Sequence, residues 1–302
     1  MVDDGVEGWS ADPRGMRPVV VGYNAKKHSR QALLWAAGEA ARQAAPLLVV
    51  HAANYPGMAS GPGPGPLDHE PGALDADQEV TVRGVSEALE AFPDLRVAGA
   101  TEVAAPADAL SDASQDAALV VVGTRGYGRV VGTLLGSVAF AVAARARCPV
   151  IVVKGEPAVR PVGPAHRVVV GTDGSAPASA AVGFAADRAA AASASLEIVA
   201  CSAGGPGADA RDTRAPAESI ARSAAARLSA ARPELDVSIR VELGPADRTL
   251  VEASDDAGLV VVGTRGRGAL EGMLLGSTSR GVISGARCPV AVLGDDQSWE
   301  VG

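Results

Sequence analysis

The chain has 302 residues, a formal net charge of −8 at pH 7 and an apolar content of 47%. This length suggests about two domains of ordinary size. The acidic balance argues against nucleic acid as a partner, because binding to phosphate backbones requires a basic surface. Aromatic residues make up only 3% of the chain, so we expect cores built from Val, Leu, Ile and Ala.

The N-terminal segment, MVDDGVEGWSADPRGMRP, is acidic and broken by Gly and Pro. It has no apolar centre and therefore does not read as a signal peptide. Elsewhere no run approaches the roughly 18 apolar residues of a membrane helix. These features predict a cytoplasmic protein with a disordered head over residues 1–16 and no membrane partner.

The first half of the chain alternates apolar runs with Ala-rich helical stretches. Between the second strand and the second helix, the segment NYPGMASGPGPGPLDHEPG is too rich in Gly and Pro to pack regularly, so it is predicted to be a loop. The expected strands are 18–22, 47–53, 95–103, 119–123 and 149–153, and the expected helices are 28–43, 74–92, 106–115 and one that begins at Ser137.

The second half repeats this order, with the shorter loop GGPGADARDTRAP after its second strand. The expected strands are 167–171, 196–203, 235–243, 259–263 and 289–293, and the expected helices are 176–192, 215–231, 245–255 and one that begins at Ser277.

Each half therefore contains five predicted strands and four predicted helices. The strands are continuous apolar runs, which is typical of parallel strands buried on both faces. We predict an α/β protein with two tandem, doubly wound, five-stranded parallel sheets and right-handed crossovers. The predicted parts are a head (1–16), a first domain (17–155), a Pro- and Gly-rich linker (156–165) and a second domain (166–296).

The most specific signal is a phrase that occurs twice. Residues 119–137 read LVVVGTRGYGRVVGTLLGS, and residues 259–277 read LVVVGTRGRGALEGMLLGS. Both contain Gly-x-x-Gly, nine further residues, and Gly-Ser. Glycines permit close backbone approach, and the N-terminus of the following helix attracts anions. The repeat therefore predicts two phosphate-binding loops, carried by Gly123, Gly126, Gly136 and Ser137 and by Gly263, Gly266, Gly276 and Ser277.

In a doubly wound sheet, ligands bind at the carboxyl ends of the strands, where the strand order reverses. The loops after the first strand of each half, YNAKKHS and TDGSAPAS, are expected to face the glycine loops there. Asp173 is then placed to bind a hydroxyl group or a metal ion. The alternative is that Asp173 only caps the next helix, a common role for Asp.

Other chemistry is weakly supported. No Walker A tripeptide Gly-Lys-Ser/Thr occurs, the four His residues are scattered, and no nucleophile–base constellation is present. Cys148 and Cys288 stand at equivalent places in two ARCPV segments. We interpret them as small buried residues, with a redox-sensing thiolate as the alternative.

These motifs resemble the universal stress protein (UspA-like) family in tandem form. The resemblance rests on the segment Val168–Ser175, on both Gly-x-x-Gly-x9-Gly-Ser loops and on the two CPV endings. It implies an adenine nucleotide alpha hydrolase-like fold with strand order 3-2-1-4-5 and ATP as ligand, with Mg²⁺ or Mn²⁺. It also implies that the two domains pair through their fifth strands, and it allows a homodimer.

The resemblance extends the candidate nucleotide site to Gly174, Thr278 and Ser279 in the second half and to Val138 in the first. The halves differ, because Asn24 replaces Asp173 and Ala139 replaces Ser279. We therefore expect two similar pockets of unequal strength, with the stronger one in the second half.

Three functions remain open at this stage. The favoured one is an ATP-binding regulator of stress or dormancy responses that acts on a protein partner the sequence does not name. The second is a slow ATPase or phosphotransfer enzyme, although no residue clearly orients a water molecule for hydrolysis. The third is an interaction scaffold whose glycine loops only preserve the fold.

Overall fold

The computed structural model describes residues 15–53, 73–124, 136–154, 161–202, 210–268 and 274–294. The chain divides into two compact units, Met1–Gly155 and Glu156–Gly302. Most of the predicted head and all of the predicted loop over residues 54–72 lie outside the described residues. The domain boundaries given above stay predictions.

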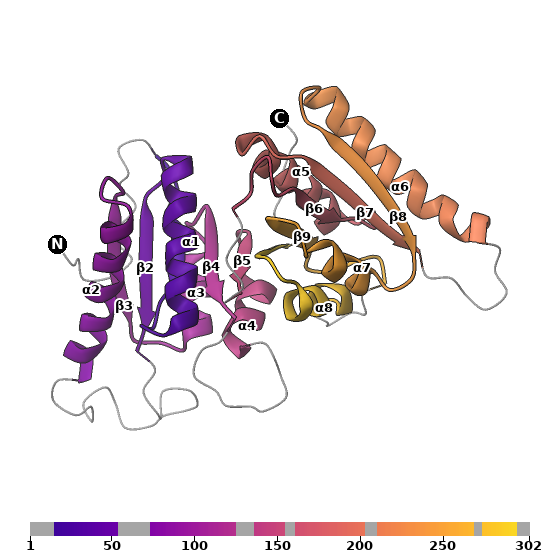
Figure 1. The fold of residues 1–302 in the computed structure, drawn as a ribbon. Helices are drawn as coiled ribbons and strands as arrows, with labels where there is room; N and C mark the ends of the chain where they lie inside the picture. Colours follow the sequence, from indigo (N-terminus) through magenta and orange to yellow (C-terminus); the bar gives the residue numbers. More distant parts are fainter. Residues whose placement is uncertain are drawn as a thin grey trace. The chain divides into compact units, whose positions relative to one another are not determined.

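The N-terminal unit contains a parallel five-stranded sheet in the order β3-β2-β1-β4-β5. Helix α1 packs beside α2, and α3 packs beside α4, so helices cover both faces of the sheet (Figure 1). The elements are β1 (Val19–Gly22), α1 (Lys27–Gln43), β2 (Leu47–Ala52), α2 (Ala73–Ala91), β3 (Val97–Glu102), α3 (Pro106–Ala113), β4 (Leu119–Gly123), α4 (Ser137–Arg145) and β5 (Val150–Val153).

The C-terminal unit repeats this topology, with the parallel order β8-β7-β6-β9-β10. Its elements are β6 (Val168–Gly171), α5 (Ala176–Ala191), β7 (Leu196–Ser202), α6 (Ala210–Ala231), β8 (Val237–Leu243), α7 (Ala246–Ala253), β9 (Leu259–Gly263), α8 (Ser277–Gly285) and β10 (Val290–Leu293).

The predicted fold class is confirmed, including the strand order 3-2-1-4-5 in each unit. Side chains of the central strands are buried, as expected for parallel strands covered on both faces: Val19, Val20 and Val21 have no exposed surface. The facing side of α1 is mostly alanine, and small side chains let the helix approach the sheet closely. Within the ranges that the structure describes, no helix combines the length and apolarity needed to cross a membrane.

One predicted loop is partly wrong. The sequence predicts that this helix begins at residue 215, but α6 begins at Ala210, within the predicted loop after β7, and includes Pro216. Proline removes one helical hydrogen bond, so Pro216 weakens the first turns of α6. Packing of α6 on β7 and β8 outweighs this loss, and the Ser202 hydroxyl donates a 2.6 Å hydrogen bond to the carbonyl of Thr213 near the start of the helix.

Helices α1 and α5 end in the same way. Each is followed by a residue in the left-handed conformation, and in both cases this residue is not glycine. Ala44 has a φ of 51° and Ser193 a φ of 50°. After each, the next N–H bonds back to the last turn: Ala45 donates to Ala40 at 2.9 Å and Ala194 to Ala189 at 2.9 Å. This is the Schellman arrangement, in which glycine is the usual residue.

We therefore expect Ala44→Gly to stabilise the N-terminal unit by about 0.5–1 kcal/mol, because relief of the left-handed strain exceeds the entropy that glycine adds to the unfolded chain. Urea denaturation followed by circular dichroism measures the change. The control is Ala41→Gly, at an exposed position within α1, which should destabilise by a similar amount. Equal losses in both variants would contradict the prediction.

Candidate functional site

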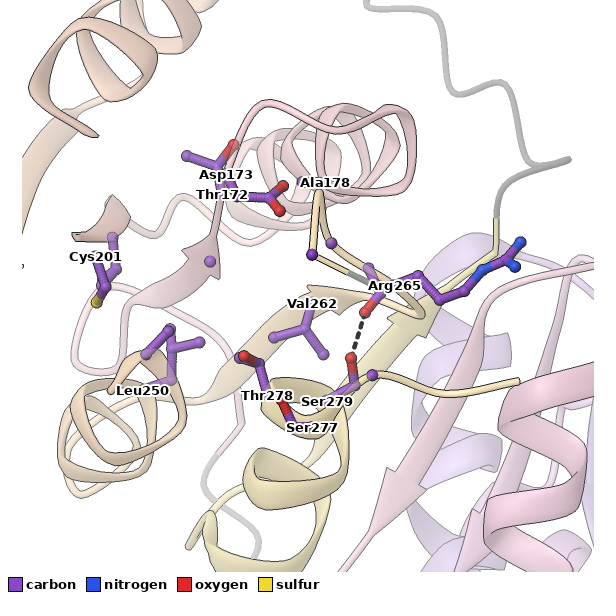
Figure 2. Close-up of a pocket in the computed structure, with 17 residues that line it drawn as sticks. Thr172, Asp173, Ala178, Cys201, Leu250, Val262, Arg265, Ser277, Thr278 and Ser279 are labelled. Atoms are coloured by element: carbon purple, nitrogen blue, oxygen red, sulfur yellow. Dashed lines mark hydrogen bonds between the residues drawn. The ribbon is translucent and has the colours of Figure 1, made fainter. Parts of the chain in front are cut away.

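The two predicted ligand loops meet at the carboxyl edge of the C-terminal sheet. Strand β6 pairs directly with β9, so the loop after β6 and the glycine loop after β9 enclose a cavity of about 270 Å³ (Figure 2). Seven predicted site residues line this cavity. An eighth, Gly174, belongs to the loop after β6 but does not line the cavity. The seven are Asp173, Gly263, Gly266, Gly276, Ser277, Thr278 and Ser279.

Asp173 joins the two loops. Its Oδ1 accepts a hydrogen bond from the Ser175 N–H at 3.0 Å, and its Oδ2 accepts one from the Arg267 N–H, in the glycine loop, at 2.7 Å. The Arg267 guanidinium donates in turn to the carbonyl of Gly174 at 3.3 Å. The N-cap of α5 is Ser175, whose hydroxyl accepts from the Ala178 N–H, so the alternative that Asp173 is this cap is wrong.

The surroundings of Asp173 favour its ionised form. Burial of this half-buried carboxyl raises its pKa. Hydrogen bonds from the Ser175 side chain and N–H and from the Arg267 N–H together lower the pKa by more than burial raises it, so the pKa of Asp173 lies below its usual value. Asp173 therefore carries a negative charge on the cavity wall at neutral pH.

Two glycines in this loop are required by close contacts. A Cβ at Gly266 would lie 2.5 Å from Asp173 Oδ2, and a Cβ at Gly263 would lie 2.7 Å from Pro177 Cβ and 2.9 Å from its backbone. Gly266 therefore makes room for the carboxylate, whereas Gly263 lets α5 begin directly against the end of β9. Gly266 thus serves the candidate site, and Gly263 serves the packing of the fold.

The opposite wall of the cavity is the start of α8. The N-cap is Gly276, not Ser277, and no side chain caps the helix. The Gly276 N–H donates to Thr264 O at 2.8 Å, which closes the base of the loop. The N–H groups of the first turn have no partners within the helix, so with the helix dipole they form a site suited to an anion.

Ser279 has a structural role that the resemblance did not suggest. It is buried, and its hydroxyl donates to Gly263 O at 2.6 Å (the dashed line in Figure 2) and approaches Thr264 O at 3.1 Å. This hydroxyl has a single proton, which is committed to the end of β9. Ser279 therefore holds the start of the glycine loop in place, while Ser277 and Thr278 are the first two residues of α8 and line the cavity.

The equivalent loop of the N-terminal unit keeps the backbone and changes the chemistry. Asn24 Oδ1 accepts from the Lys26 N–H at 3.2 Å, as Asp173 does from Ser175. Ala25 adopts a φ of 58° where Gly174 has 74°. Lys26 stands at the position of Ser175 and gives no side-chain cap to α1.

The glycine loop of this unit is described only at its ends. A Cβ at Gly123 would lie 2.6 Å from His28 O, and the Gly136 N–H donates to Thr124 O at 2.6 Å. Ser137 and Val138 begin α4, with Gly136 as the N-cap. Gly126, the remaining predicted site residue, lies outside the described residues.

Sequence reasoning missed the apolar wall of the C-terminal cavity. It includes Val199 and Cys201 from β7, Leu250 from α7 and Val262 from β9. Each is an ordinary apolar residue in an element that motifs do not mark. Only the alternation along β7, which turns residues 199 and 201 to one face, carried any signal for them. Arg265 also lines the cavity, although Figure 2 shows its guanidinium extending away from Asp173 and Thr278.

Cys148, Cys288 and His51 fit structural roles. Cys148 and Cys288 are buried, and burial raises the pKa of the Cys148 thiol to about 12, which opposes the redox-sensing alternative. His51 is buried, with its two ring nitrogens 2.9 Å from the carbonyl of Tyr23 and 2.9 Å from Asp77 Oδ1.

A model of the universal stress protein family matches residues 15–154 and 164–294. The chain belongs to the universal stress protein family. Among related family members, it is 35% identical to the universal stress protein Rv2005c of Mycobacterium tuberculosis over 291 residues, which cover 93% of this chain and 98% of the relative. Rv2623 of the same organism is 34% identical over 288 residues, covering 91% and 95%.

A crystal structure of a universal stress protein from Archaeoglobus fulgidus has the same fold, with a TM-score of 0.67 and 20% identity over 92% of this chain and 96% of that one. The tandem family assignment made from the repeated motifs is thus confirmed.

Asp173→Asn should destabilise the C-terminal unit by about 1 kcal/mol at pH 7. The Asn side chain has one oxygen, so if that oxygen accepts from the Ser175 N–H, the amide NH₂ group faces the Arg267 N–H and two donors oppose each other. The folded-state pKa of Asp173 is lowered, so its stabilisation is full above the unfolded pKa and is lost as the pH falls through the folded value. The difference between the two proteins should shrink as the pH falls below about 4.

Chemical denaturation at a series of pH values measures this difference. Glu234→Gln removes an equal charge at an exposed position of the same unit and should leave stability nearly unchanged. A difference that is constant with pH would show that the Asp173 charge is not the source.

Proposed function

We propose that the C-terminal unit binds an adenine nucleotide, with ATP as the preferred ligand. The observation that carries this proposal is the cavity in which the uncapped start of α8 and the glycine loop face an apolar wall across one cleft. Phosphates fit the helix terminus and the loop N–H groups, and a purine fits the wall of Val199, Cys201 and Leu250. Asp173, with Gly174 next to it in the same loop, is proposed to bind the ribose hydroxyls.

The cavity residues fit a metal ion only together with phosphate. Within the described ranges, no group of three or more His, Cys, Asp or Glu side chains is placed to hold a metal ion. Among the described residues that line the cavity, Asp173 is the sole carboxylate, and both of its oxygens already accept hydrogen bonds. Mg²⁺ or Mn²⁺ would therefore arrive with the nucleotide and take most of its ligands from phosphate and water.

The N-terminal unit is proposed to hold a second, weaker nucleotide site. Its candidate residues are Asn24, Gly123, Gly126, Gly136, Ser137 and Val138. Asn24 supplies an amide where Asp173 supplies a carboxylate, so ribose hydroxyls lose a charged acceptor. The two sites are thus expected to fill at different nucleotide concentrations.

The cellular role proposed from family membership is regulation of a stress or dormancy response in the cytoplasm. Nucleotide occupancy would alter the loops around the cavity and so change binding to a protein partner. Pairing of the two domains through β5 and β10 remains a prediction. Enzymatic turnover is not proposed, because among the described residues that line the cavity none stands out as a group that orients water for attack on a phosphate.

Titration of the purified protein with ATP by isothermal calorimetry tests the proposal. Wild type should bind below millimolar concentration, and Gly266→Ala should weaken the C-terminal site about tenfold or more, because its Cβ would displace the Asp173 carboxylate. Gly163→Ala is the control, since a Cβ there meets nothing within 4 Å. Absence of ATP binding by wild type with or without Mg²⁺ would leave the scaffold function in its place.

Alkylation of Cys201 offers a second readout of the same cavity. Cys201 lines the cavity and is half-buried, whereas Cys148 and Cys288 are buried and are not among the residues that line it. Bound ATP should slow iodoacetamide labelling of Cys201, measured by peptide mass spectrometry, and leave the two buried thiols at their low basal rates. Equal labelling with and without saturating ATP would place the nucleotide elsewhere.

A further inference from the structure

Strand β8 is an edge strand with an open side. It is the last strand in the order β10-β9-β6-β7-β8 and pairs with β7 along its full length, Val237–Leu243. Figure 1 shows it as a long orange strand beside α6. Among the described residues of this unit, no other strand pairs with it. Such an edge presents backbone N–H and C=O groups that are free to pair with another strand.

The hydrogen bonds to β7 reveal which backbone groups of β8 point outward. The Leu196 N–H donates to Asp236 O, and the Gly244 N–H donates to Ser202 O. Because N–H and C=O groups alternate in direction along a strand, even-numbered residues address β7. The backbone groups of Ile239, Val241 and Leu243 therefore face away from the sheet. The side chains of Ile239 and Leu243 are 40% and 42% exposed.

Side chains of alternate residues point to opposite faces of a strand, so Arg240 and Glu242 lie on the face opposite to Ile239 and Leu243. Arg240 Nε lies 3.1 Å from Glu242 Oε1, and a second guanidinium nitrogen lies 4.0 Å from Glu252 on α7. The side chains of Arg240 and Glu242 keep 32% and 44% of their surface exposed. Both charges are thus accessible at the edge of the sheet.

We propose that β8 is a self-association surface, which pairs in antiparallel register with β8 of a second copy about a two-fold axis through Val241. In this register each Arg240 lies opposite Glu242 of the other copy, and each Ile239 lies opposite Leu243. The outward backbone groups of residues 239, 241 and 243 then meet one another. The same surface serves both chains, so the assembly closes as a dimer.

Charge selects this register over its neighbours. A two-fold axis through Arg240 would place the two arginines opposite each other, and an axis through Glu242 would pair the two glutamates. Like charges directly opposite destabilise strand pairing, whereas opposite charges stabilise it. A charged edge strand usually prevents pairing, but here the charges complement their own two-fold copy.

The edge strand of the N-terminal unit lacks this pattern. Strand β3 reads VAGATE, with Gly99 in its centre and Glu102 as its one charge. No antiparallel register of this strand with itself brings opposite charges together. The inference therefore concerns β8 alone.

Sedimentation velocity of the full chain over about 1–300 µM tests the pairing. A ladder of five residues is small, so we expect wild type to dimerise reversibly within this range. Arg240→Glu places four negative charges at the two-fold axis, and Glu242→Arg places four positive ones. Each single variant should raise the dimer dissociation constant about tenfold or more.

Two combinations then distinguish the register from a loss of folding. An equimolar mixture of the two single variants should form a heterodimer near the wild-type affinity, because each acidic strand meets a basic one. The double variant Arg240→Glu/Glu242→Arg should regain its homodimer. The proposal is overturned if wild type stays monomeric, if either single variant dimerises as wild type does, or if the mixture fails to associate. ATP is omitted throughout, so the result is independent of the nucleotide site.

Discussion

The pairing of the first strand of each unit with the fourth is the constraint on which the candidate site depends. Strands β6 and β9 run parallel and adjacent, so the two segments that leave their carboxyl ends emerge side by side. The next helix, α5, must begin against the end of β9, and only a residue without a Cβ fits there, as the 2.7 Å and 2.9 Å approaches to Pro177 show. Gly263 thus determines how close the helix terminus and the loop can lie. Gly123 meets the backbone of His28 under the same constraint.

The duplicated chain separates what the fold requires from what the site requires. Both units keep the strand order, the turn that follows the first strand, and the closing bond from Gly136 to Thr124 or from Gly276 to Thr264. Ala25 even adopts the left-handed backbone that Gly174 adopts, at a cost in strain that glycine would avoid. The side chains at the cavity changed while this backbone persisted, since they contribute little to packing of the core.

Charged side chains act at two separate places in the C-terminal unit. At the cavity, Asp173 is held ionised by hydrogen bonds from Ser175 in its own loop and from Arg267 in the facing glycine loop. At the sheet edge, Arg240 and Glu242 leave a pattern that matches its own two-fold copy. Both depend on backbone geometry first, because N–H groups determine which carboxylate oxygen is satisfied and which side of β8 is open.

The fold class, the number of strands in each unit and the two candidate ligand loops could be predicted from the amino-acid sequence alone. Continuous apolar runs, helical Ala-rich stretches and a phrase that occurs twice are local patterns, and local patterns are what a sequence displays. Other features emerge only from the folded chain. Asp173 binds the glycine loop and does not cap α5, and Ser279 donates to Gly263. Val199, Cys201 and Leu250 form one wall, and α6 begins at Ala210, ahead of its predicted start at residue 215. Each of these depends on contacts between residues distant in the chain or on packing that outweighs a local preference, and no local pattern encodes either one.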